Sequence, residues 1–286
     1  MTSSWINAVS AKRAEAMALG ELQQIETEQV VIMQGDLPFI VRWLNADQAE
    51  HKSLFSGAAS YATTTNPFLP PAEALTVGKI GDYHHVVLNK YPVCENHVVL
   101  ARSDIAQQLE PLEYQDFLAL AALICEEGGL GFYNGGPLAG ASQAHKHVQW
   151  IPEADGNASL SYVCQQLSAD ADEHSVHQIS QFAMPHAVIR LSTSHDVDEY
   201  ARSLFVAYQL ACMRLKQEPD ELGLMPPANI LVDRQWLLMV PRTLQQAEQV
   251  AVNALSFGGV LYVNDEVHVD TIRKVGPLRL LAAVCA

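Results

Sequence analysis

A run of alternating polar residues, His145-Lys146-His147-Val148-Gln149, constrains the fold of this 286-residue chain more than any other feature. Successive side chains of an extended strand point to opposite faces, so residues two apart share a face. As a strand, the run places two imidazoles and one amide on one surface, with Lys146 and Val148 on the other. The spacing therefore predicts a strand that carries its functional polar side chains on one face.

The segment before this strand bends the chain. Asn134-Gly135-Gly136-Pro137-Leu138-Ala139-Gly140 carries three glycines and a proline, which favour turns and leave backbone N–H groups exposed. Exposed N–H groups bind anions, and an imidazole beside a bound phosphate can act as a nucleophile. We therefore expect a phosphate-handling site in which His147 is the reactive group.

Two alternatives fit the alternating histidines equally well when only their spacing is considered: metal ligands, or half-buried polar residues of a structural strand. The third polar position is Gln149, and an amide is a poor ligand for zinc. The preceding loop adds Ser142 and Gln143, which are uncharged hydrogen-bonding groups. These features favour catalysis, and we expect no protein-bound metal ion.

Composition excludes several classes of protein. The chain is 49% hydrophobic and 17% charged, which predicts a sizeable core and excludes global disorder. Its formal charge of −15 argues against binding to nucleic acids or to anionic membranes. No apolar run approaches the roughly 18 residues of a membrane span, and residues 1–5 do not resemble a signal peptide. Five scattered cysteines without a C-x-x-C pair are typical of a cytoplasmic protein with reduced thiols.

The order of predicted elements indicates an α+β fold, an antiparallel sheet flanked by helices. Periodicity predicts helices at 8–26, 111–128, 198–215 and 269–284. Apolar or alternating runs predict strands at 30–33, 39–43, 84–90, 97–101, 131–133, 145–149, 186–191, 229–233, 236–242 and 260–263. Strands 84–90 and 97–101 form a hairpin that carries Asn89 and Lys90 near its bend. Lys90 can supply a point charge for phosphate, although most lysines are simply solvated.

At the strand 145–149 the chain resembles the histidine-triad superfamily, and most closely its diadenosine tetraphosphate phosphorylase (ATP adenylyltransferase) branch. Similar segments extend over nearly the whole chain, at 66–71, 88–92, 133–143, 229–242 and 272–278. Residues 134–149 are the most specific of these segments. Ala144 departs from the proline of many relatives, but it lies off the proposed catalytic face. The family's lysine before residue 66 has Lys52 as its nearest candidate.

The resemblance implies a role for each matching residue. His147 is the nucleophile that accepts an adenylyl group, Gln149 contacts the phosphate of the resulting intermediate, and His145 orients the strand or a phosphate. The residues that cradle phosphate are Gly140, Ala141, Ser142 and Gln143. The nucleotide site is lined by Asn89, Lys90 and Asn134, and the C-terminal half adds Asn229 and Arg242 as substrate contacts.

The resemblance also implies a reaction, the reversible phosphorolysis of diadenosine tetraphosphate to ATP and ADP through a covalent His147–AMP intermediate. Sulfate is a possible second acceptor. No cofactor is obligatory, and we expect Mg²⁺ only as a companion of the polyphosphate substrate. Gln149 cannot titrate, so the intermediate would wait for phosphate and escape hydrolysis by activated water. We expect a single unit, with an N-terminal half (1–160) that bears the strand and a C-terminal half (161–286) that completes the nucleotide cleft.

Two other functions compete with this one. A hexose-1-phosphate nucleotidylyltransferase uses a similar His-x-His-x-Gln strand, but those enzymes usually place proline between the histidines and often bind metal through Cys or His. Lys146 and the absence of paired cysteines count against that reading. A non-catalytic adenine-nucleotide-binding sensor would keep the pocket without turnover. The sequence leaves the oligomeric state open.

Overall fold

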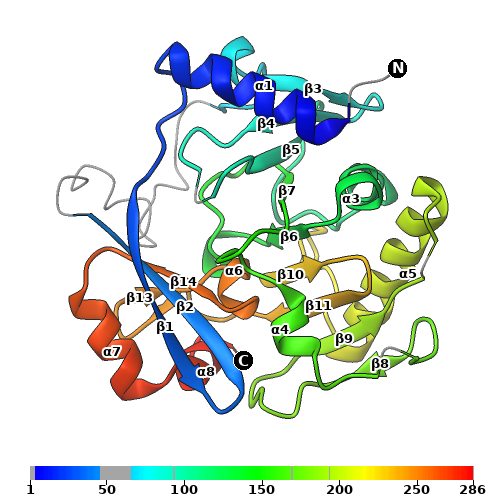
Figure 1. Cartoon of the computed structure of the whole chain (residues 1–286). Coiled ribbons are helices and arrows are strands. Elements are labelled where there is room, and N and C mark those ends of the chain that lie inside the picture. Colours follow the sequence, from blue (N-terminus) through cyan, green and yellow to red (C-terminus); the bar gives the residue numbers. More distant parts are fainter. Residues whose placement is uncertain (1–3, 46–65, 93, 169, 193, 286) are drawn as a thin grey trace.

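The computed structural model describes residues 4–45, 66–92, 94–168, 170–192 and 194–285. In these residues a nine-stranded sheet forms the centre of the molecule (Figure 1), in the order β3-β4-β5-β7-β6-β10-β11-β9-β8. Every neighbouring pair in it is antiparallel. Its strands are β3 (Thr76–Ile80), β4 (His84–Leu88), β5 (Val98–Arg102), β6 (Leu130–Asn134), β7 (His147–Ile151), β8 (Val176–His177), β9 (Ala187–Arg190), β10 (Ala228–Val232) and β11 (Trp236–Pro241). The predicted α+β fold is confirmed, and the sheet runs through both sequence halves.

A second, three-stranded sheet joins the two ends of the chain. Strands β1 (Thr27–Gln34) and β2 (Leu37–Leu44) form a hairpin whose two-residue turn places Gly35 at a φ of 60°, a conformation that glycine adopts without a steric penalty. Strand β14 (Val260–Val263) pairs with β2 in parallel. Both strands agree with the predicted strands at 30–33 and 39–43, whereas the parallel partner, far away in the sequence, was not predicted. A short ribbon of β12 (Gln246–Ala247) and β13 (Val250–Ala251) lies between β11 and β14 along the chain.

Helices cover one face of the main sheet along its length. They are α1 (Trp5–Ala18), α3 (Tyr114–Glu127) and α5 (Val197–Leu215). Strand residues of this face, such as Leu100, Val148 and Ile230, form one hydrophobic cluster with the helices. The helix predicted at 8–26 is shorter than expected, because the chain leaves α1 after Ala18 through Gly20 at a φ of 73°.

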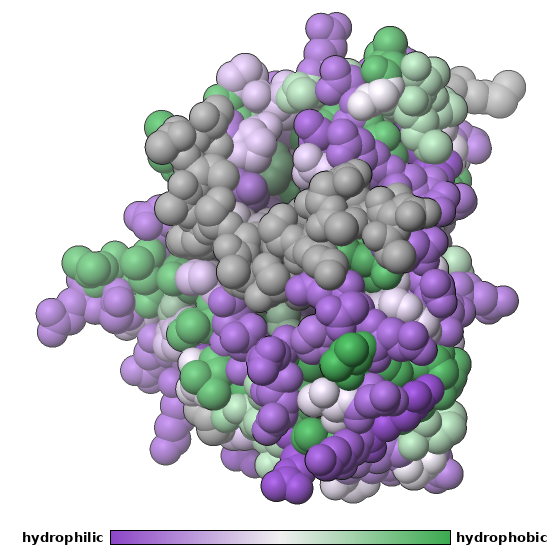
Figure 2. Space-filling model, turned by 90° about the vertical axis from the view of Figure 1, so that its left-hand side faces the viewer, coloured by the Kyte–Doolittle hydropathy of each residue, from purple (hydrophilic) through white to green (hydrophobic). Residues whose placement is uncertain are grey.

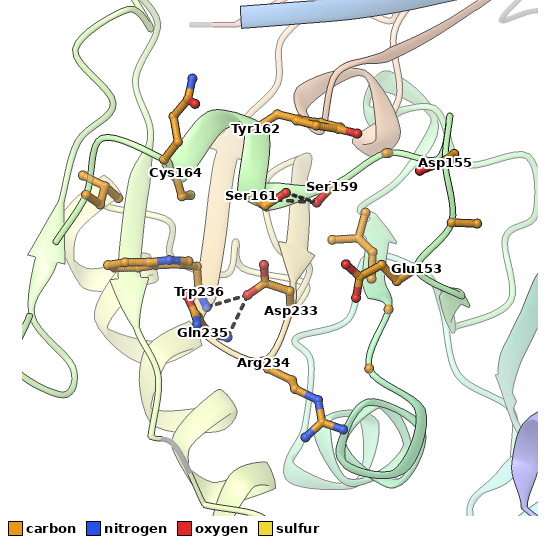
Figure 3. A pocket seen from close by; sticks show the side chains of 17 residues that line it. Glu153, Asp155, Ser159, Ser161, Tyr162, Cys164, Asp233, Arg234, Gln235 and Trp236 are labelled. Atoms are coloured by element: carbon orange, nitrogen blue, oxygen red, sulfur yellow. Dashed lines mark hydrogen bonds between the residues drawn. The ribbon is translucent and has the colours of Figure 1, made fainter. Parts of the chain in front are cut away.

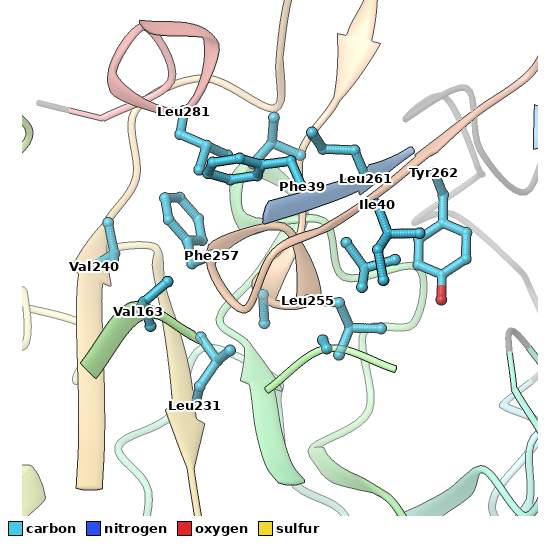
Figure 4. Packing of buried hydrophobic residues seen from close by; sticks show 14 of the residues in the cluster. Phe39, Ile40, Val163, Leu231, Val240, Leu255, Phe257, Leu261, Tyr262 and Leu281 are labelled. Carbon is cyan, nitrogen blue, oxygen red and sulfur yellow. The ribbon is translucent and has the colours of Figure 1, made fainter. Parts of the chain in front are cut away.

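The opposite face is covered only toward the C-terminal strands. Leu231 and Val240 pack there beneath the second sheet (Figure 4). The same hydrophobic cluster contains Phe132 and Leu238. The short helices of this layer are α4 (Leu160–Cys164), α6 (Ala254–Phe257), α7 (Val267–Val275) and α8 (Pro277–Ala282). The single helix predicted at 269–284 is wrong, since Gly276 at a φ of 90° ends α7 and Pro277 starts α8; proline favours the first turn of a helix.

Toward β5 this second face carries a small, separate cluster. Phe68 packs there on Val99 and Ala101, and it reaches the sheet from the segment before the 3₁₀ turn η2 (Glu73–Leu75). Val99 pairs with Gln149 and Ala101 pairs with His147. The part of the face that carries the predicted chemistry thus lies outside the large hydrophobic cluster.

The outer surface contains scattered apolar side chains, of which Ile105 and Leu222 are among the most exposed. Hydrophilic residues predominate on the face shown in Figure 2, as expected for so acidic a chain. Among the described residues, no helix has the length and apolarity needed to cross a bilayer.

A buried ionic cluster lies on the helix side of β7, directly behind His147. Asp116, at the start of α3 and 1% exposed, accepts a hydrogen bond from Nε2 of His84 at 2.9 Å. Its carboxylate also lies 3.6 Å from Nζ of Lys146 and 3.8 Å from Nη1 of Arg102. Lys146 is therefore on the opposite face from His147, as the alternation predicted. Unlike most lysines, which are exposed to solvent, it is buried.

We expect Asp116→Ala to destabilise the fold by about 3–5 kcal/mol, because it leaves the buried Lys146 ammonium without its carboxylate and the buried His84 ring without its hydrogen-bond partner. Urea unfolding at pH 7 measures the change. Asp270→Ala, which removes an exposed pair with Arg273, is the control and should leave the midpoint unchanged. An unaltered midpoint for Asp116→Ala would show that the cluster contributes no stability.

The sign of the pH dependence follows from the same cluster. Burial acts to raise the pKa of the Asp116 carboxyl, but the hydrogen bond from His84 and the charge of Lys146 outweigh burial and lower the pKa. The stabilisation is therefore present at neutral pH and is lost as the pH falls through this lowered pKa.

Candidate active site

The polar residues of the predicted strand occupy the start of β7. Regular pairing begins at His147, opposite Ala101, while His145 precedes the strand and forms an isolated bridge with Gln107. Gln149 follows two residues later on the same face, opposite Val99. The predicted strand therefore begins two residues too early, but the shared face of His147 and Gln149 is present.

The His147 ring is held in one tautomer. Its Nδ1 lies 2.8 Å from the backbone carbonyl oxygen of His145, and a carbonyl can only accept, so Nδ1 carries the proton. Nε2 consequently has the lone pair, and none of the described residues forms a hydrogen bond with it. Burial lowers the pKa of His147 to about 4, so the ring is neutral at pH 7. A neutral imidazole with a free Nε2 is a competent nucleophile.

Gln108, a residue that the sequence analysis missed, fixes the backbone of His147. Strand β6 pairs with β7 only as far as Phe132 opposite Gln149. Beyond that point the fully buried Gln108 amide replaces the missing strand, since its Oε1 accepts from the His147 N–H at 2.8 Å. Its Nε2 donates to the His147 carbonyl at 3.1 Å and to that of Asn134 at 2.8 Å. A single glutamine in a loop carries no sequence signal for such a role.

Two further contacts hold the pair of histidines. Nε2 of His145 donates to the carbonyl oxygen of Arg102 at 2.7 Å. The Phe68 ring lies over both imidazoles, with centroids 5.9 Å from His145 and 5.4 Å from His147. These contacts fix the His145 ring, whose orienting role stays a prediction, and Phe68 brings the 66–71 segment of the family resemblance to the site.

Gln149 is held through its carbonyl oxygen. Oε1 accepts a hydrogen bond from Nε2 of His97 at 2.9 Å, and His97 is only 4% exposed. Asn89, predicted to line the nucleotide site, donates from Nδ2 to Nδ1 of His97 at 3.3 Å. Its Oδ1 accepts from the Tyr91 N–H at 3.1 Å. The polar atoms of Asn89 thus serve the hairpin, because both ends of its amide are already bonded.

Lys90, the cation predicted for phosphate, lies at the same bend and is exposed. Its Nζ is 5.7 Å from the centre of the Tyr91 ring. Lys52, the candidate for the family's other lysine, falls outside the described residues.

The glycine-rich loop folds into a tight turn, η3 (Pro137–Ala139). Gly140 has a φ of 91°, and a Cβ there would lie 2.8 Å from Cβ of Asn253, so glycine is required. The N–H of Gly140 donates to Pro137 and that of Ala141 donates to Gly136, both at 3.0 Å. The N–H groups of Gly140 and Ala141 are therefore not exposed, as the glycine-rich loop led us to expect, since the turn itself uses both donors. That these two residues cradle phosphate stays a prediction.

The second half of the predicted cradle stays a prediction. Ser142 is exposed and Gln143 is half-buried. No described residue forms a hydrogen bond with the hydroxyl or the N–H of Ser142. Ser142 therefore remains open to an anion.

The structure brings Asn134, Asn229 and Arg242 together, but it buries them. They are 6%, 0% and 3% exposed. Asn229 Nδ2 donates to Asn134 Oδ1 at 2.9 Å and to the Ala139 carbonyl at 2.8 Å. Arg242 donates to Asn229 Oδ1 and to the Val252 carbonyl. The polar groups of the three side chains bind one another and support the glycine-rich loop. Their role as substrate contacts stays a prediction.

Burial lowers the pKa of Arg242 to about 10. Protein carbonyl oxygens take the place of water around its guanidinium, which also donates hydrogen bonds to the carbonyl oxygens of Leu244 and Val284. The cation thereby ties the end of β11 to the C-terminal segment.

A cavity of about 730 Å³ lies at the opposite end of β7 (Figure 3). It is lined by Glu153 after β7 and by Asp233 and Trp236 at the β10–β11 turn. Neither His147 nor Gln149 lines it, so its size does not make it the site of the His147 chemistry. Among the described residues, no three His, Cys, Asp or Glu side chains are grouped as metal ligands would be.

Comparison with known proteins places these features in a family. Residues 2–165 match the family model of the Ap4A phosphorylase N-terminal domain, and residues 180–286 match that of the ATP adenylyltransferase C-terminal domain; Ap4A is diadenosine tetraphosphate. A curated relative, Protein APA1 of Saccharomyces cerevisiae, is 26% identical over 231 residues, which cover 71% of this chain and 70% of the relative.

A second curated relative from the same yeast, diadenosine 5',5'''-P1,P4-tetraphosphate phosphorylase 2, is 25% identical over 238 residues, covering 73% of this chain and 72% of the relative. Among solved structures, yeast Ap4A phosphorylase Apa2 in complex with Ap4A has a similar fold, with a TM-score of 0.78 and 19% identity over 100% of this chain and 98% of that one. The first family model alone matches more than half of the residues. The chain therefore belongs to the Ap4A phosphorylase (ATP adenylyltransferase) family.

Proposed function

We propose that this protein is a nucleotidyltransferase that catalyses the reversible phosphorolysis of Ap4A to ATP and ADP. The observation that carries the proposal is the state of His147, a neutral imidazole whose only proton is on the bonded Nδ1. Membership of the family supports this substrate class, because a yeast relative is named for Ap4A phosphorolysis and the yeast Ap4A phosphorylase Apa2 was crystallised with Ap4A.

In the first step, Nε2 of His147 attacks an α-phosphorus of Ap4A. The new N–P bond forms as the P–O bond to the departing ATP breaks, which leaves AMP on the imidazole. The ring gains positive charge in this step, and the Nδ1–H bond to the His145 carbonyl strengthens as it does so. Covalent catalysis replaces one high barrier by two lower ones, while positioning supplies much of the acceleration.

In the second step, an oxygen of inorganic phosphate attacks the same phosphorus. ADP forms, and the N–P bond electrons return to Nε2. Phosphate is anionic at neutral pH and needs no base to become a nucleophile, whereas water does. Gln149 is neutral and cannot act as that base, which favours phosphate over water. We extend the proposal to sulfate, a similar tetrahedral oxyanion, as a second acceptor, and to Mg²⁺ only as a companion of the polyphosphate.

The two competing functions make different products. A hexose-1-phosphate nucleotidylyltransferase would need a sugar phosphate as acceptor, and the family models that match both parts of the chain favour the adenylyltransferase. A nucleotide-binding sensor would bind Ap4A without releasing ADP. Measuring ATP and ADP formed from Ap4A with and without phosphate separates the three.

We expect His147→Ala to lower Ap4A phosphorolysis by about 10⁴-fold or more, because the nucleophile is lost. With Ap4A labelled at its α-phosphorus and no phosphate present, the wild type should carry an acid-labile, base-stable label that the variant lacks. His195→Ala, which removes an exposed histidine, should retain full activity. A labelled His147→Ala protein would refute the assignment.

The pKa of His147 predicts the pH profile. Because burial lowers that pKa to about 4, the nucleophile stays unprotonated down to acidic pH, and its protonation should reduce kcat/KM only as the pH approaches that value. The measurement is kcat/KM for Ap4A from pH 8 to the lowest pH at which the protein stays folded. An acidic limb near pH 6.5, the value of an unperturbed histidine, would contradict the buried, neutral state.

We expect Gln108→Met, nearly equal in volume, to lower kcat by about 10–100-fold, because the His147 backbone loses its two hydrogen bonds to Gln108 and the Asn134 carbonyl loses a third. The matched control is Gln107→Met at the exposed neighbouring residue, which should change kcat by less than about twofold. Equal effects of the two substitutions on kcat would show that the hydrogen bonds of Gln108 do not contribute to catalysis.

A further inference from the structure

Four residues form a directed chain of hydrogen bonds that ends at Gln149. The Tyr91 N–H donates to Asn89 Oδ1 at 3.1 Å. Asn89 Nδ2 lies 3.3 Å from His97 Nδ1, and His97 Nε2 lies 2.9 Å from Gln149 Oε1. All four come from the β4–β5 hairpin and the neighbouring β7, so the chain runs across the sheet toward the catalytic face.

The first link determines the direction of every other link. A backbone N–H can only donate, so the Asn89 atom that faces Tyr91 must be the oxygen, and its amide nitrogen must face His97. Nδ1 of His97 then accepts, which leaves the ring proton on Nε2. That N–H must meet an acceptor, so the carbonyl oxygen of Gln149 faces His97 and its NH₂ group points away.

We propose that His97 is a positioning residue that sets the orientation of the Gln149 amide, so that the NH₂ group of Gln149 faces the phosphoryl group in transfer. The proposal rests on the proposed function and extends it to a residue outside the His-x-His-x-Gln strand. No described residue accepts a hydrogen bond from the Gln149 NH₂ group, which leaves that group open to substrate. A flipped amide would present oxygen lone pairs to a phosphate that carries negative charge.

The surroundings of His97 keep it in the required state. Its ring is 4% exposed and packs against Phe132, with centroids 5.7 Å apart. Burial lowers the pKa of His97 to about 4, so the ring stays neutral. An imidazolium would put a second N–H against the NH₂ group of Asn89, which also donates. His97 and His147 thus carry their protons on opposite nitrogens, Nε2 in His97 and Nδ1 in His147.

The tautomers give a test that needs no turnover. Nitrogen-15 NMR of histidine-labelled protein without ligand should show His97 protonated on Nε2 and His147 protonated on Nδ1, with assignments made from His97→Gln and His147→Ala. A His97 ring protonated on Nδ1 would overturn the proposal, whether or not the protein proves to act on Ap4A.

Substitution at His97 tests the consequence for catalysis. His97→Leu removes the donor at similar volume, and it should lower the rate of label transfer from α-labelled Ap4A to His147 by about 100-fold, as loss of an oriented donor does elsewhere. His97→Gln restores an N–H donor and should recover that rate to within about tenfold of the wild type. KM for Ap4A should change by less than about threefold, because the bond to phosphate strengthens in the transition state.

A double-mutant cycle separates positioning from a general structural effect. Gln149→Ala should itself cost about 100-fold, and adding His97→Leu to it should cost less than about threefold more, because His97 acts only through Gln149. Losses that multiply would overturn the proposal. If His97→Leu does not fold, Asn89→Leu at the half-buried end of the chain replaces it, with an expected loss of about three- to tenfold that also vanishes beside Gln149→Ala.

The wild-type control separates failure of the proposed function from failure of the hydrogen-bond chain. A wild type that takes no label from Ap4A contradicts the proposed function, and the NMR tautomers then test the hydrogen-bond chain independently. A labelled wild type with an unaffected His97→Leu contradicts the chain alone.

Discussion

The state of the His147 ring depends on one hydrogen bond, from Nδ1 of His147 to the backbone carbonyl of His145. A histidine in water exchanges its proton between two nitrogens and is partly charged near neutral pH. The carbonyl two residues earlier removes the first freedom, and burial of the ring removes the second. The ring therefore presents a single lone pair, on Nε2, and hydrogen bonds hold the backbone of its strand. The rest of the site is best understood as the means by which this bond is kept in place.

The sheet needs outside support at that point because β6 leaves β7 before His147. A buried backbone N–H or carbonyl without a partner costs about as much as a lost hydrogen bond. Gln108 meets that need from one side, and the Asn134–Asn229–Arg242 group holds the loop on the other. On the helix side, the Asp116 cluster binds the residue between the two histidines, Lys146. Several elements therefore hold His147 in place, and none of these contacts involves its Nε2 atom.

Charge is arranged differently on the two faces of β7. The helix face carries the cations and carboxylates, paired and buried. On the catalytic face, the described side chains that contact His147 or Gln149 are neutral: Phe68, His97 and the amide of Gln108. Neutral hydrogen-bonding groups suit a reaction in which the substrate is strongly anionic and in which both steps have similar transition states. An acidic group there would repel phosphate, and a titrating group would admit water as a nucleophile.

The sequence correctly predicted features that depend on local geometry. These include the antiparallel sheet, the two strands that form the β1–β2 hairpin, the shared face of His147 and Gln149, and the position of Lys146 on the opposite face. Its errors were also local in origin: the end of α1, the break at Gly276, and the assumption that glycine-rich N–H groups are free. A glycine turn can expose its donors or consume them, and periodicity does not distinguish these cases.

What the sequence by itself determined is which groups can share one surface, because the period of a strand is two residues and does not depend on the rest of the chain. Only the tertiary structure decided which atoms of those groups are reactive. Gln108 reaches His147 across 39 positions of the chain, and His97 reaches Gln149 across 52. Proton positions and amide orientations follow from such distant partners, since a hydrogen bond is set by what lies within about 3 Å in space and not by what is adjacent in sequence.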